Sequence, residues 1–284
     1  MTNRACLAGV ALGDGLPVAV MGALNVSPES FHQGSVVTTG DGLLRAAEAM
    51  AKAGAVLVDI GAMSTAPYLN AAVTESEEAR RLSWAVDLVA TRIDLPISAD
   101  TSRSAPARAA LEAGARVVND VSGFMGDPLM ADLVSRAGAG VILMASERGA
   151  VRSGDAIGTV NALLEESLSL ARRAGIGPSS IVVDPGIGFF RHQMVAWDAW
   201  DCTILGGLAG LHRLGQPICV GVSRKSFIGA VAGVEDPAGR LPGSLAAAAA
   251  AVLNGTHLIR THDVEETVQA VRVAEAIRHA SERT

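Results

Sequence analysis

Polar and charged side chains follow short apolar runs at regular intervals along this sequence. They are Asn25, Asp59, Asp100, Asn119, Asp184, Ser223 with Lys225, and Arg260 with His262. Asp, Asn and Ser also cap helix N-termini, so capping explains any single one of them equally well. Lys225, Arg260 and His262 are poor caps, however, and carboxylates close to cations require mutual pairing or a shared polar ligand. Together the residues predict one polar site.

The apolar runs before these residues are predicted strands. They cover Val18–Leu24, Val56–Ile60, Ile97–Ala99, Val117–Asn119, Val141–Met144, Ile181–Val183, Ile218–Val220 and His257–Ile259. Helical patterns rich in Ala and Leu lie between them, over Gly42–Ala53, Glu75–Thr91, Pro106–Ala113, Asp127–Ala137, Thr159–Ala174, Ala199–Leu214, Ser244–Leu253 and Val264–Ala280. Several helices are expected to end in a left-handed C-cap, at Gly54, Gly114, Gly138, Gly175, Gly215 and Gly255.

This alternation predicts an α/β fold, because continuous apolar strands followed by helices form parallel sheets covered on both faces. Eight such units in 284 residues predict a (β/α)8 TIM barrel. We expect a single domain over residues 1–284, with roughly the first 15 residues peripheral. A doubly wound open sheet is the alternative, but Met21–Asn25 does not form its glycine-rich first turn. In a barrel, the ends of the strands would bring the polar residues together.

Composition excludes several classes of protein. The chain is 49% hydrophobic and 18% charged, which excludes a disordered chain. A net charge of −6, without a basic run, argues against a nucleic-acid partner. The longest apolar run, Leu245–Leu253, is too short to span a membrane. Three cysteines without ligand spacing fit a reducing compartment, so we expect a cytoplasmic protein.

Six sequence blocks resemble the motifs of dihydropteroate synthases, and they occur in the family's order. The blocks are VMGALNVSPESF (20–31), SADTS (98–102), VNDVSG (118–123), DPGIGF (184–189), GVSRKSFIG (221–229) and RTHDV (260–264). The resemblance implies a barrel enzyme, a homodimer, that acts in folate biosynthesis. Such an enzyme condenses 6-hydroxymethyl-7,8-dihydropterin diphosphate with p-aminobenzoate and releases diphosphate.

The resemblance also assigns roles to individual residues. The implied pterin pocket comprises Asp100, Asn119, Val121, Met144, Asp184, Phe189, Gly221 and Lys225. The arylamine and diphosphate are implied to contact Thr65, Pro67, Ser223, Arg260 and His262. The implied catalytic residues are Asn25, Lys225, Arg260 and His262, and Asn25 is also the implied ligand of Mg²⁺. Elementary chemistry agrees, because a carboxylate accepts two hydrogen bonds from the donor edge of a pterin and Mg²⁺ prefers oxygen ligands.

The second of the loops departs from the family's pattern. It reads GAMSTAPY over 61–68, so Ala66 stands where the family usually has an Arg that meets the diphosphate and the arylamine carboxylate. One explanation is a dihydropteroate synthase with an altered loop, as in members that tolerate sulfonamides. Another is a related condensing enzyme that uses a ribosylated aminobenzene, as in a tetrahydromethanopterin-type pathway. A pterin-binding methyltransferase domain is a third, but it would have no diphosphate for Lys225, Arg260 and His262 to bind.

The remaining polar features have simpler interpretations. Arg191 follows Phe190 where the family usually has Gly-Lys. Four of the six histidines, His32, His192, His212 and His257, lack metal-ligand spacing, so surface or hydrogen-bonded positions are expected for them. The charges of Glu75–Glu78 and Arg80–Arg81 predict a solvated helix face. By the resemblance alone, the apolar side of Val264–Ala280 and the helix before it are candidate dimer surfaces.

Overall fold

A closed parallel barrel forms the centre of the molecule. The computed structural model describes residues 2–27, 39–63, 73–147 and 153–281. Within them, eight parallel strands follow the order β8-β7-β6-β5-β4-β3-β10-β9. They are β3 (Ala19–Asn25), β4 (Leu57–Gly61), β5 (Ile97–Asp100), β6 (Val117–Asp120), β7 (Gly140–Met144), β8 (Ile181–Asp184), β9 (Cys219–Gly221) and β10 (Leu258–Thr261). A parallel bridge between Val183 and Ile218 joins β8 to the residue before β9. The predicted (β/α)8 fold and all eight predicted strands are confirmed.

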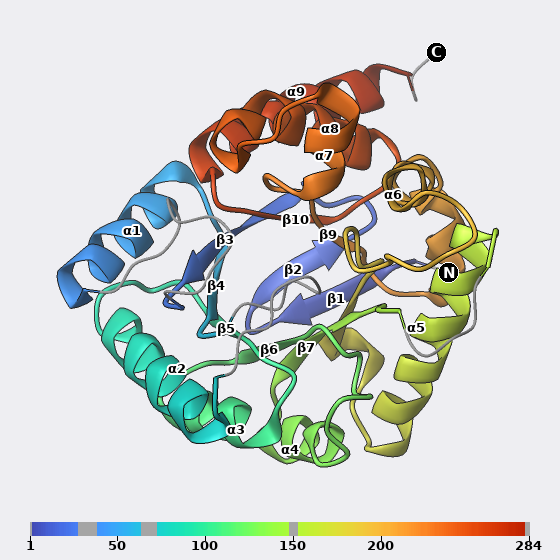
Figure 1. Cartoon of the computed structure of the whole chain (residues 1–284). Helices are drawn as coiled ribbons and strands as arrows, with labels where there is room; N and C mark the ends of the chain where they lie inside the picture. Colours follow the sequence, from blue (N-terminus) through green and yellow to red (C-terminus); the bar gives the residue numbers. More distant parts are fainter. Residues whose placement is uncertain (1, 28–38, 64–72, 148–152, 282–284) are drawn as a thin grey trace.

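Helices surround this barrel on all sides (Figure 1). They are α1 (Gly40–Ala53), α2 (Glu75–Ala90), α3 (Ser104–Glu112), α4 (Met130–Ala137), α5 (Ala156–Arg173), α6 (Trp197–Gly206), α7 (Ser226–Ala232), α8 (Leu241–Leu253) and α9 (Val264–Ser281), with 3-10 turns at Pro178–Ser180, Leu208–Leu214 and Pro237–Arg240. The six glycines predicted as C-caps all have positive φ, between 60° and 121°. The helix ends at these glycines were therefore predicted correctly.

Two helical segments differ from the prediction. The predicted helix Ala199–Leu214 is divided, because α6 ends at Gly206 and a 3-10 turn begins at Leu208. The adjacent glycines Gly206 and Gly207 explain the break, since glycine is a poor helix former. The seven-residue helix α7 was not predicted and lies directly after Lys225. It is too short to show a helical period in the sequence.

An antiparallel hairpin lies outside the barrel sheet. Strands β1 (Arg4–Leu7) and β2 (Val10–Gly13) are joined by Ala8 and Gly9, both with positive φ, as in a type I′ turn. Leu7 and Leu12 are fully buried against residues at the beginnings of the barrel strands. In the view of Figure 1 the hairpin overlaps the middle of the barrel, and its contacts place it at the end where the strands begin. The first residues thus contribute side chains to the core, although the sequence placed them at the periphery.

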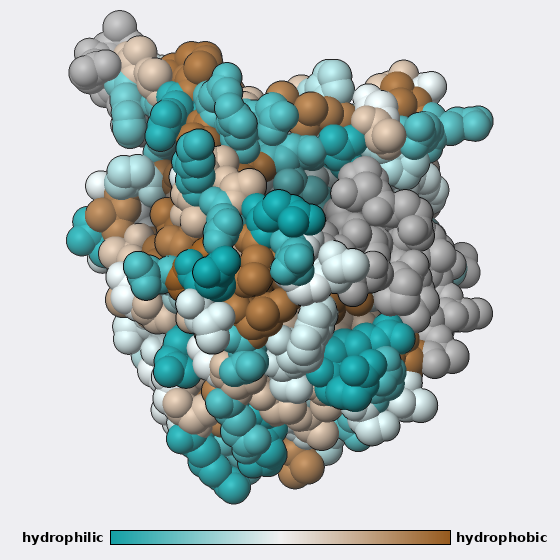
Figure 2. Space-filling model, turned by 90° about the vertical axis from the view of Figure 1, so that its left-hand side faces the viewer, coloured by the Kyte–Doolittle hydropathy of each residue, from teal (hydrophilic) through white to brown (hydrophobic). Residues whose placement is uncertain are grey.

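One side of the outer surface carries both hydrophilic and hydrophobic residues. Figure 2 shows the side that carries α1, where hydrophobic residues gather near the middle and hydrophilic residues surround them. Among the described residues, no helix is long and apolar enough to cross a membrane. The apolar faces of the helices are used mainly to cover the barrel, as α1 does by burying Leu43 and Ala47.

Candidate active site

The sheet register brings the predicted residues to one end of the barrel. Asn25, Asp100 and Asp184 are the last residues of β3, β5 and β8. Gly61 of β4 pairs with both Asn25 and Asp100, so these two side chains flank the same position. Further pairs in this layer are Asp100 with Asn119, Met144 with Asp184, and Gly221 with Arg260. Parallel strands thus gather these residues at their carboxyl ends.

Arg260 connects three strands through its hydrogen bonds. Its Nε donates to Asp59 Oδ2 over 2.6 Å, and its Nη2 donates to Asp100 Oδ2 over 2.8 Å. Asn119 Nδ2 donates to the same Asp59 oxygen over 3.0 Å. Asp59 is completely buried, and the Arg260 side chain is 20% exposed. Arg260 therefore balances two buried carboxylates, and the pKa of its guanidinium is raised because they outweigh the effect of burial.

The surroundings of Asp100 change the pKa of its side chain strongly. Burial raises the pKa of Asp100 to about 7, opposed by Arg260 and reinforced by the nearby charge of Asp59. Neither Asp100 Oδ1 nor Asp59 Oδ1 has a hydrogen-bond partner among the described residues. An acceptor buried without a partner is costly. Such atoms are suited to accept hydrogen bonds from a bound ligand.

A second cluster unites a carboxylate, an ammonium and an aromatic ring. Asp184 Oδ1 accepts a hydrogen bond from the Gly186 N–H over 2.7 Å. Burial raises the pKa of Asp184, while the charge of Lys225 opposes the rise. Lys225 Nζ donates to the Ile187 carbonyl and lies 4.9 Å from the ring centre of Phe189. This part of the carboxyl end of the barrel offers an acceptor, Asp184, and a donor, Lys225, next to the flat apolar ring of Phe189.

A third cluster contains the remaining predicted catalytic residues. Asn25 Nδ2 lies 3.3 Å from His262 Nε2, and His262 Nδ1 lies 3.0 Å from Ser223 Oγ. If the Asn25 amide donates to Nε2, the proton of a neutral His262 lies on Nδ1. Next to Ser223, Arg224 binds both oxygens of Asp263, at 2.9 and 2.7 Å. That buried ion pair fixes the loop that carries Ser223 and Lys225.

Other predicted residues lie around these clusters, and some lie outside the described chain. Met144 and Gly221 are buried at the ends of β7 and β9, and Val121 follows β6 and is partly exposed. Thr65 and Pro67 fall outside the described residues, as does His32. The buried His257 accepts from the Ile218 N–H and pairs with Asp14. His212 contacts the Gly255 carbonyl. Hydrogen-bonded positions are thus confirmed for these last two histidines.

Two neighbouring loops at the rim are connected through Glu147. Its carboxylate accepts from the backbone N–H groups of Arg191 and His192, from Gln193 Nε2 over 2.6 Å, and pairs with His192 Nδ1 over 2.8 Å. The Arg191 guanidinium donates to Ser226 Oγ over 2.7 Å and stacks 4.3 Å above the Trp197 ring. These contacts hold the loop after β8 against the loop after β7.

Sequence reasoning missed two buried carboxylates. Glu78 was predicted on a solvated face, but it is fully buried and accepts hydrogen bonds from Thr101 Oγ1 and Arg103 Nη1. Asp201 is also fully buried, on α6. It shares a face of α6 with the buried Ile204 and Leu205, and a carboxylate at that spacing from apolar residues is a signal that could have revealed it. Glu147 offered no such signal, because its partners come from another loop.

The donor set limits how a metal could bind. Among the described residues, no group of three His, Cys, Asp or Glu side chains could hold a metal ion. Asn25 offers one amide oxygen, while Asp59 and Asp100 each give an oxygen to Arg260. Mg²⁺ commonly binds through few protein ligands together with phosphate oxygens and water. The residues therefore fit Mg²⁺ only if a bound ligand supplies most of the oxygens.

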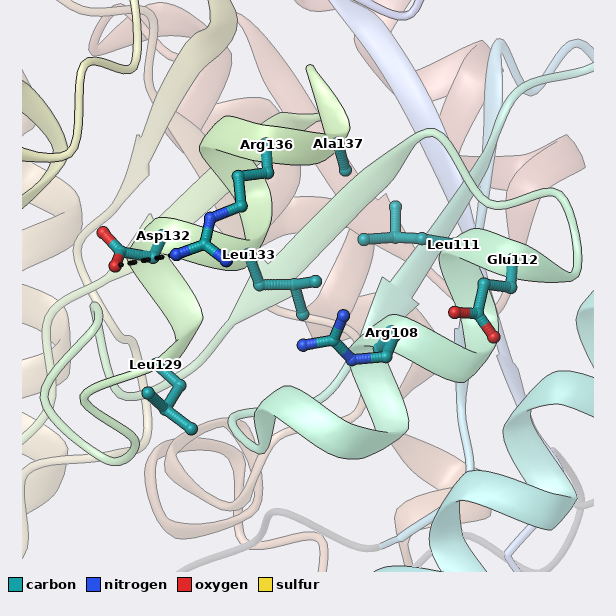
Figure 3. Close-up of a pocket in the computed structure, with 8 residues that line it drawn as sticks. All are labelled: Arg108, Leu111, Glu112, Leu129, Asp132, Leu133, Arg136 and Ala137. Atoms are coloured by element: carbon teal, nitrogen blue, oxygen red, sulfur yellow. Dashed lines mark ion pairs between the residues drawn. The ribbon is translucent and has the colours of Figure 1, made fainter.

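A groove on the outer surface is separate from this site (Figure 3). It lies between α3 and α4 and is lined by Arg108, Leu111, Glu112, Leu129, Asp132, Leu133, Arg136 and Ala137. Arg136 pairs with Asp132 over 3.6 Å, and both side chains are largely exposed. None of the predicted site residues in the described chain lines it. The chemistry is therefore concentrated at the strand ends.

Comparisons with known proteins agree with this geometry. The sequence profile described as "Pterin binding enzyme" matches residues 21–262. A dihydropteroate synthase of Synechocystis is 36% identical over 264 residues, covering 91% of this chain and 89% of that protein. A Xanthomonas albilineans dihydropteroate synthase solved with 4-aminobenzoic acid superimposes with a TM-score of 0.86 at 36% identity, covering 98% and 99% of the two chains. A Yersinia pestis dihydropteroate synthase solved in a sulfonamide complex superimposes with a TM-score of 0.87 at 34% identity, covering 98% of this chain and 99% of that one.

Proposed function

The chain belongs to the pterin-binding enzyme family as a dihydropteroate synthase, and we propose how its residues divide the work of that transferase. The enzyme transfers a pterin methylene group from 6-hydroxymethyl-7,8-dihydropterin diphosphate to p-aminobenzoate, with loss of diphosphate. The observation that supports the division of roles is the arrangement of Asp184 beside Lys225 at the same strand ends as the Asp100–Arg260 pair. Acceptors and donors for a flat heterocycle thus lie beside donors for a diphosphate.

The pterin is bound by the buried acceptors and by Lys225. Asp184 and Asp100 accept hydrogen bonds from the pterin's 2-amino and ring N–H groups, and Asn119 adds an amide. Lys225 donates to the ring carbonyl. Its ammonium has three N–H donors, of which one goes to Ile187, so others are available to the ligand. Val121, Met144, Phe189 and Gly221 line the faces and floor of the pocket.

The diphosphate is bound by Arg260 and His262. An arginine has five N–H donors, and Arg260 gives two of them to Asp59 and Asp100. The remaining donors can therefore bind phosphate oxygens while the guanidinium stays fixed. His262 would contribute through Nε2 as the doubly protonated imidazole, which a nearby diphosphate favours by charge; the Asn25 amide nitrogen, which lies 3.3 Å from Nε2, would then have to turn away from it. Because Arg260 is held by two carboxylates, its position does not depend on the ligand.

Magnesium is proposed to enter with the diphosphate. The Asn25 side-chain oxygen would supply one ligand, and diphosphate oxygens and water would supply the others. When bound, the ion contributes positive charge next to the diphosphate. Asn25 lies next to His262, whose Nε2 is 3.3 Å from its amide nitrogen. The two residues thus act on the same end of the substrate.

The chemical step is a substitution at the pterin methylene carbon. The bond to the diphosphate oxygen breaks with its electron pair, and Arg260 and His262 stabilise the negative charge that develops there. The methylene left behind carries positive charge delocalised into the ring. Asp100 and Asp184 favour that charge electrostatically. The arylamine nitrogen then forms the new bond to carbon and loses a proton, and no covalent bond to the protein is required.

The arylamine is proposed to lie near Ser223. The Ser223 hydroxyl lies 3.0 Å from His262 Nδ1, so an arylamine at Ser223 would be next to the proposed diphosphate side. Thr65 and Pro67 of the second loop would complete this side. Ala66 in that loop supplies no guanidinium for a benzoate carboxylate. A ribosylated aminobenzene is the alternative substrate that this difference favours.

Family membership also supports a proposal for the assembly and location of the protein. We infer a cytoplasmic homodimer that uses the face formed by α7, α8 and α9. Four large apolar side chains are exposed on these helices: Val231, Leu253, Val273 and Ile277. Figure 1 shows the three helices grouped on one side of the barrel. Light scattering of the purified protein would detect the dimer, and Ile277→Glu would be expected to weaken it.

A turnover experiment tests this function directly. The purified chain is given pterin diphosphate with either p-aminobenzoate or a ribosylated aminobenzene, with and without Mg²⁺, and diphosphate release is measured. We expect Mg²⁺-dependent release with p-aminobenzoate. Preference for the ribosylated compound would identify the alternative condensing enzyme. If the protein binds the pterin but releases no diphosphate with either amine, the result would contradict a synthase and support a methyltransferase or carrier role.

A further inference from the structure

One peptide group connects Lys225 to a buried carboxylate on the helical layer. The Ile187 carbonyl accepts a hydrogen bond from Lys225 Nζ. The N–H of the same peptide unit, which belongs to Gly188, donates to Asp201 Oδ1 over 2.8 Å. The ammonium and the carboxylate are therefore joined through a single planar amide. Hydrogen bonds at both ends of an amide polarise it and strengthen each other.

Asp201 lies in a buried position, where a charged side chain is costly. Its side chain is fully buried on α6, between the loop after β8 and the apolar residues of its own helix. Its second oxygen, Oδ2, has no hydrogen-bond partner among the described residues. A neutral amide could accept the same hydrogen bond from Gly188 at a lower desolvation cost. The hydrogen bond alone therefore does not explain a carboxylate at this position.

The charge of Asp201 acts on the groups around it. Burial raises the pKa of Asp201 to about 6, so the side chain is mostly ionised at neutral pH. Lys225 and Arg191 favour its ionised form, and Asp198 opposes it. In return, burial lowers the pKa of Lys225, while the charges of Asp184 and Asp201 raise it. Asp201 thus helps to keep the Lys225 ammonium protonated, against the like charges of Arg260 and Arg191.

The loop that carries this peptide is shaped for a close approach. Gly188 has φ +84°, and a Cβ built there would lie 3.2 Å from Lys225 Cδ. Gly186 has φ +74°, and a Cβ there would lie 1.9 Å from the Ala145 carbonyl oxygen. Side chains are strained at both positions because φ is positive. The backbone therefore passes directly against the lysine stem and against the end of β7.

We propose that Asp201 is a positioning residue that acts through the Ile187–Gly188 peptide to orient Lys225 and to keep it charged for the pterin carbonyl. This role rests on the proposed function, because it concerns how Lys225 meets the pterin. Asp201 itself touches no substrate in this proposal. By holding the Ile187–Gly188 peptide in place, Asp201 fixes the direction of one ammonium N–H of Lys225, and the other N–H groups remain available to the ligand.

The chain offers an unusually direct measurement of this effect. Lys52 and Lys225 are the two lysines in the sequence, so protein labelled with 13C at lysine Cε gives two signals. Lys52 is exposed near the end of α1 and serves as an internal reference. A pH titration followed by NMR then yields the pKa of Lys225 without any ligand. The result does not depend on whether the protein turns over a substrate.

The key variant is Asp201→Asn, which keeps an acceptor for Gly188 and removes the charge. We expect the pKa of Lys225 to fall by about one unit, while that of Lys52 is unchanged. The matched control is Asp198→Asn, which removes a carboxylate from the same helix that makes no hydrogen bond to the loop. An equal pKa of Lys225 in both variants would overturn the proposal. Asp201→Ser, a shorter neutral acceptor, provides a second variant if Asp201→Asn unfolds.

Pterin binding tests the functional consequence. Calorimetry with 6-hydroxymethylpterin should show affinity about tenfold weaker in Asp201→Asn, a loss of about 1.4 kcal/mol. In a Lys225→Gln background, Asp201→Asn should cause no further loss, because the partner is absent. Equal losses in both backgrounds would indicate a purely structural role and overturn the proposal. Failure of the wild-type protein to release diphosphate would instead count against the proposed function.

Discussion

The guanidinium of Arg260 and the carboxylate of Asp59 are 201 residues apart in the sequence, and their nearest atoms are 2.6 Å apart. They come from β10 and β4, which flank β3 in the sheet. Asp59 has no exposed surface and receives a second hydrogen bond from Asn119. The pair therefore links non-adjacent strands at the carboxyl end of the barrel. It also holds Arg260 in place before any ligand arrives.

Removing Asp59 should destabilise the protein strongly. Asp59→Ala leaves Arg260 Nε and Asn119 Nδ2 without their shared buried acceptor, and unsatisfied buried donors of this kind cost about 3 kcal/mol or more in total. For a chain of this length the midpoint of thermal unfolding should fall by roughly 6–12 °C. Calorimetry of unfolding measures both values. The control is Glu77→Gln, because Glu77 pairs with Arg80 and Arg81 on the outside of α2 and its loss should have no measurable effect.

Asp184→Asn should weaken pterin binding. The amide can no longer accept two charge-assisted hydrogen bonds, and it places a donor against the donor edge of the ring. We expect the dissociation constant for 6-hydroxymethylpterin to rise by about 10- to 100-fold. Calorimetry measures this constant, with Asp132→Asn in the outer groove as the matched control. Retained affinity in Asp184→Asn would rule out this carboxylate as the pterin acceptor.

Asn25→Ala should raise the Mg²⁺ concentration needed for half-maximal turnover by about tenfold, because the one protein oxygen proposed for the ion is lost. Binding of 6-hydroxymethylpterin, which lacks the diphosphate, should be unchanged. Diphosphate release measured across a Mg²⁺ series tests the first statement, and calorimetry tests the second. Asn254→Ala, at the end of α8, is the control. An unaltered Mg²⁺ dependence would show that Asn25 has another role.

The stability of Asp201→Asn relative to the wild type should depend on pH. The pKa of Asp201 is about 6 in the folded protein and near 4 in the unfolded chain, so the folded state holds the proton more tightly. The stabilisation that Asp201 contributes by binding its proton in the folded state is therefore fully present below about pH 4, and it is lost as the pH rises through about 6. Two pKa units correspond to about 3 kcal/mol.

Denaturant unfolding of both proteins at pH 4.5 and pH 7.5 measures this difference. The variant has no titrating group at position 201, so its stability relative to the wild type should increase between the two pH values. Other groups with raised pKa values, such as Glu78, are present in both proteins and cancel in the comparison. A difference that stays constant with pH would contradict a raised pKa for Asp201.

Local patterns in the sequence were sufficient for the barrel and for much of the site. A strand buried on both faces must be mainly apolar, so strands appear in the sequence as apolar runs such as Val141–Met144. A left-handed helix end strongly favours glycine, so Gly54 and Gly138 mark helix ends. Parallel topology then places the last residue of each strand at one end. Asp100, Asp184 and Arg260 could therefore be grouped from the sequence alone.

Only the tertiary structure decided which of these groups are partners. Glu78 is a surface charge by its neighbours in the sequence, yet Thr101 and Arg103 bury it from another loop. Arg260 was expected to face the diphosphate, and two of its donors are bound to Asp59 and Asp100. Asp201 reaches Lys225 through a peptide of a third segment. Such pairings depend on sheet register and on how loops approach one another. Residue type specifies what a side chain can bind, and the closed barrel determines what lies within its reach.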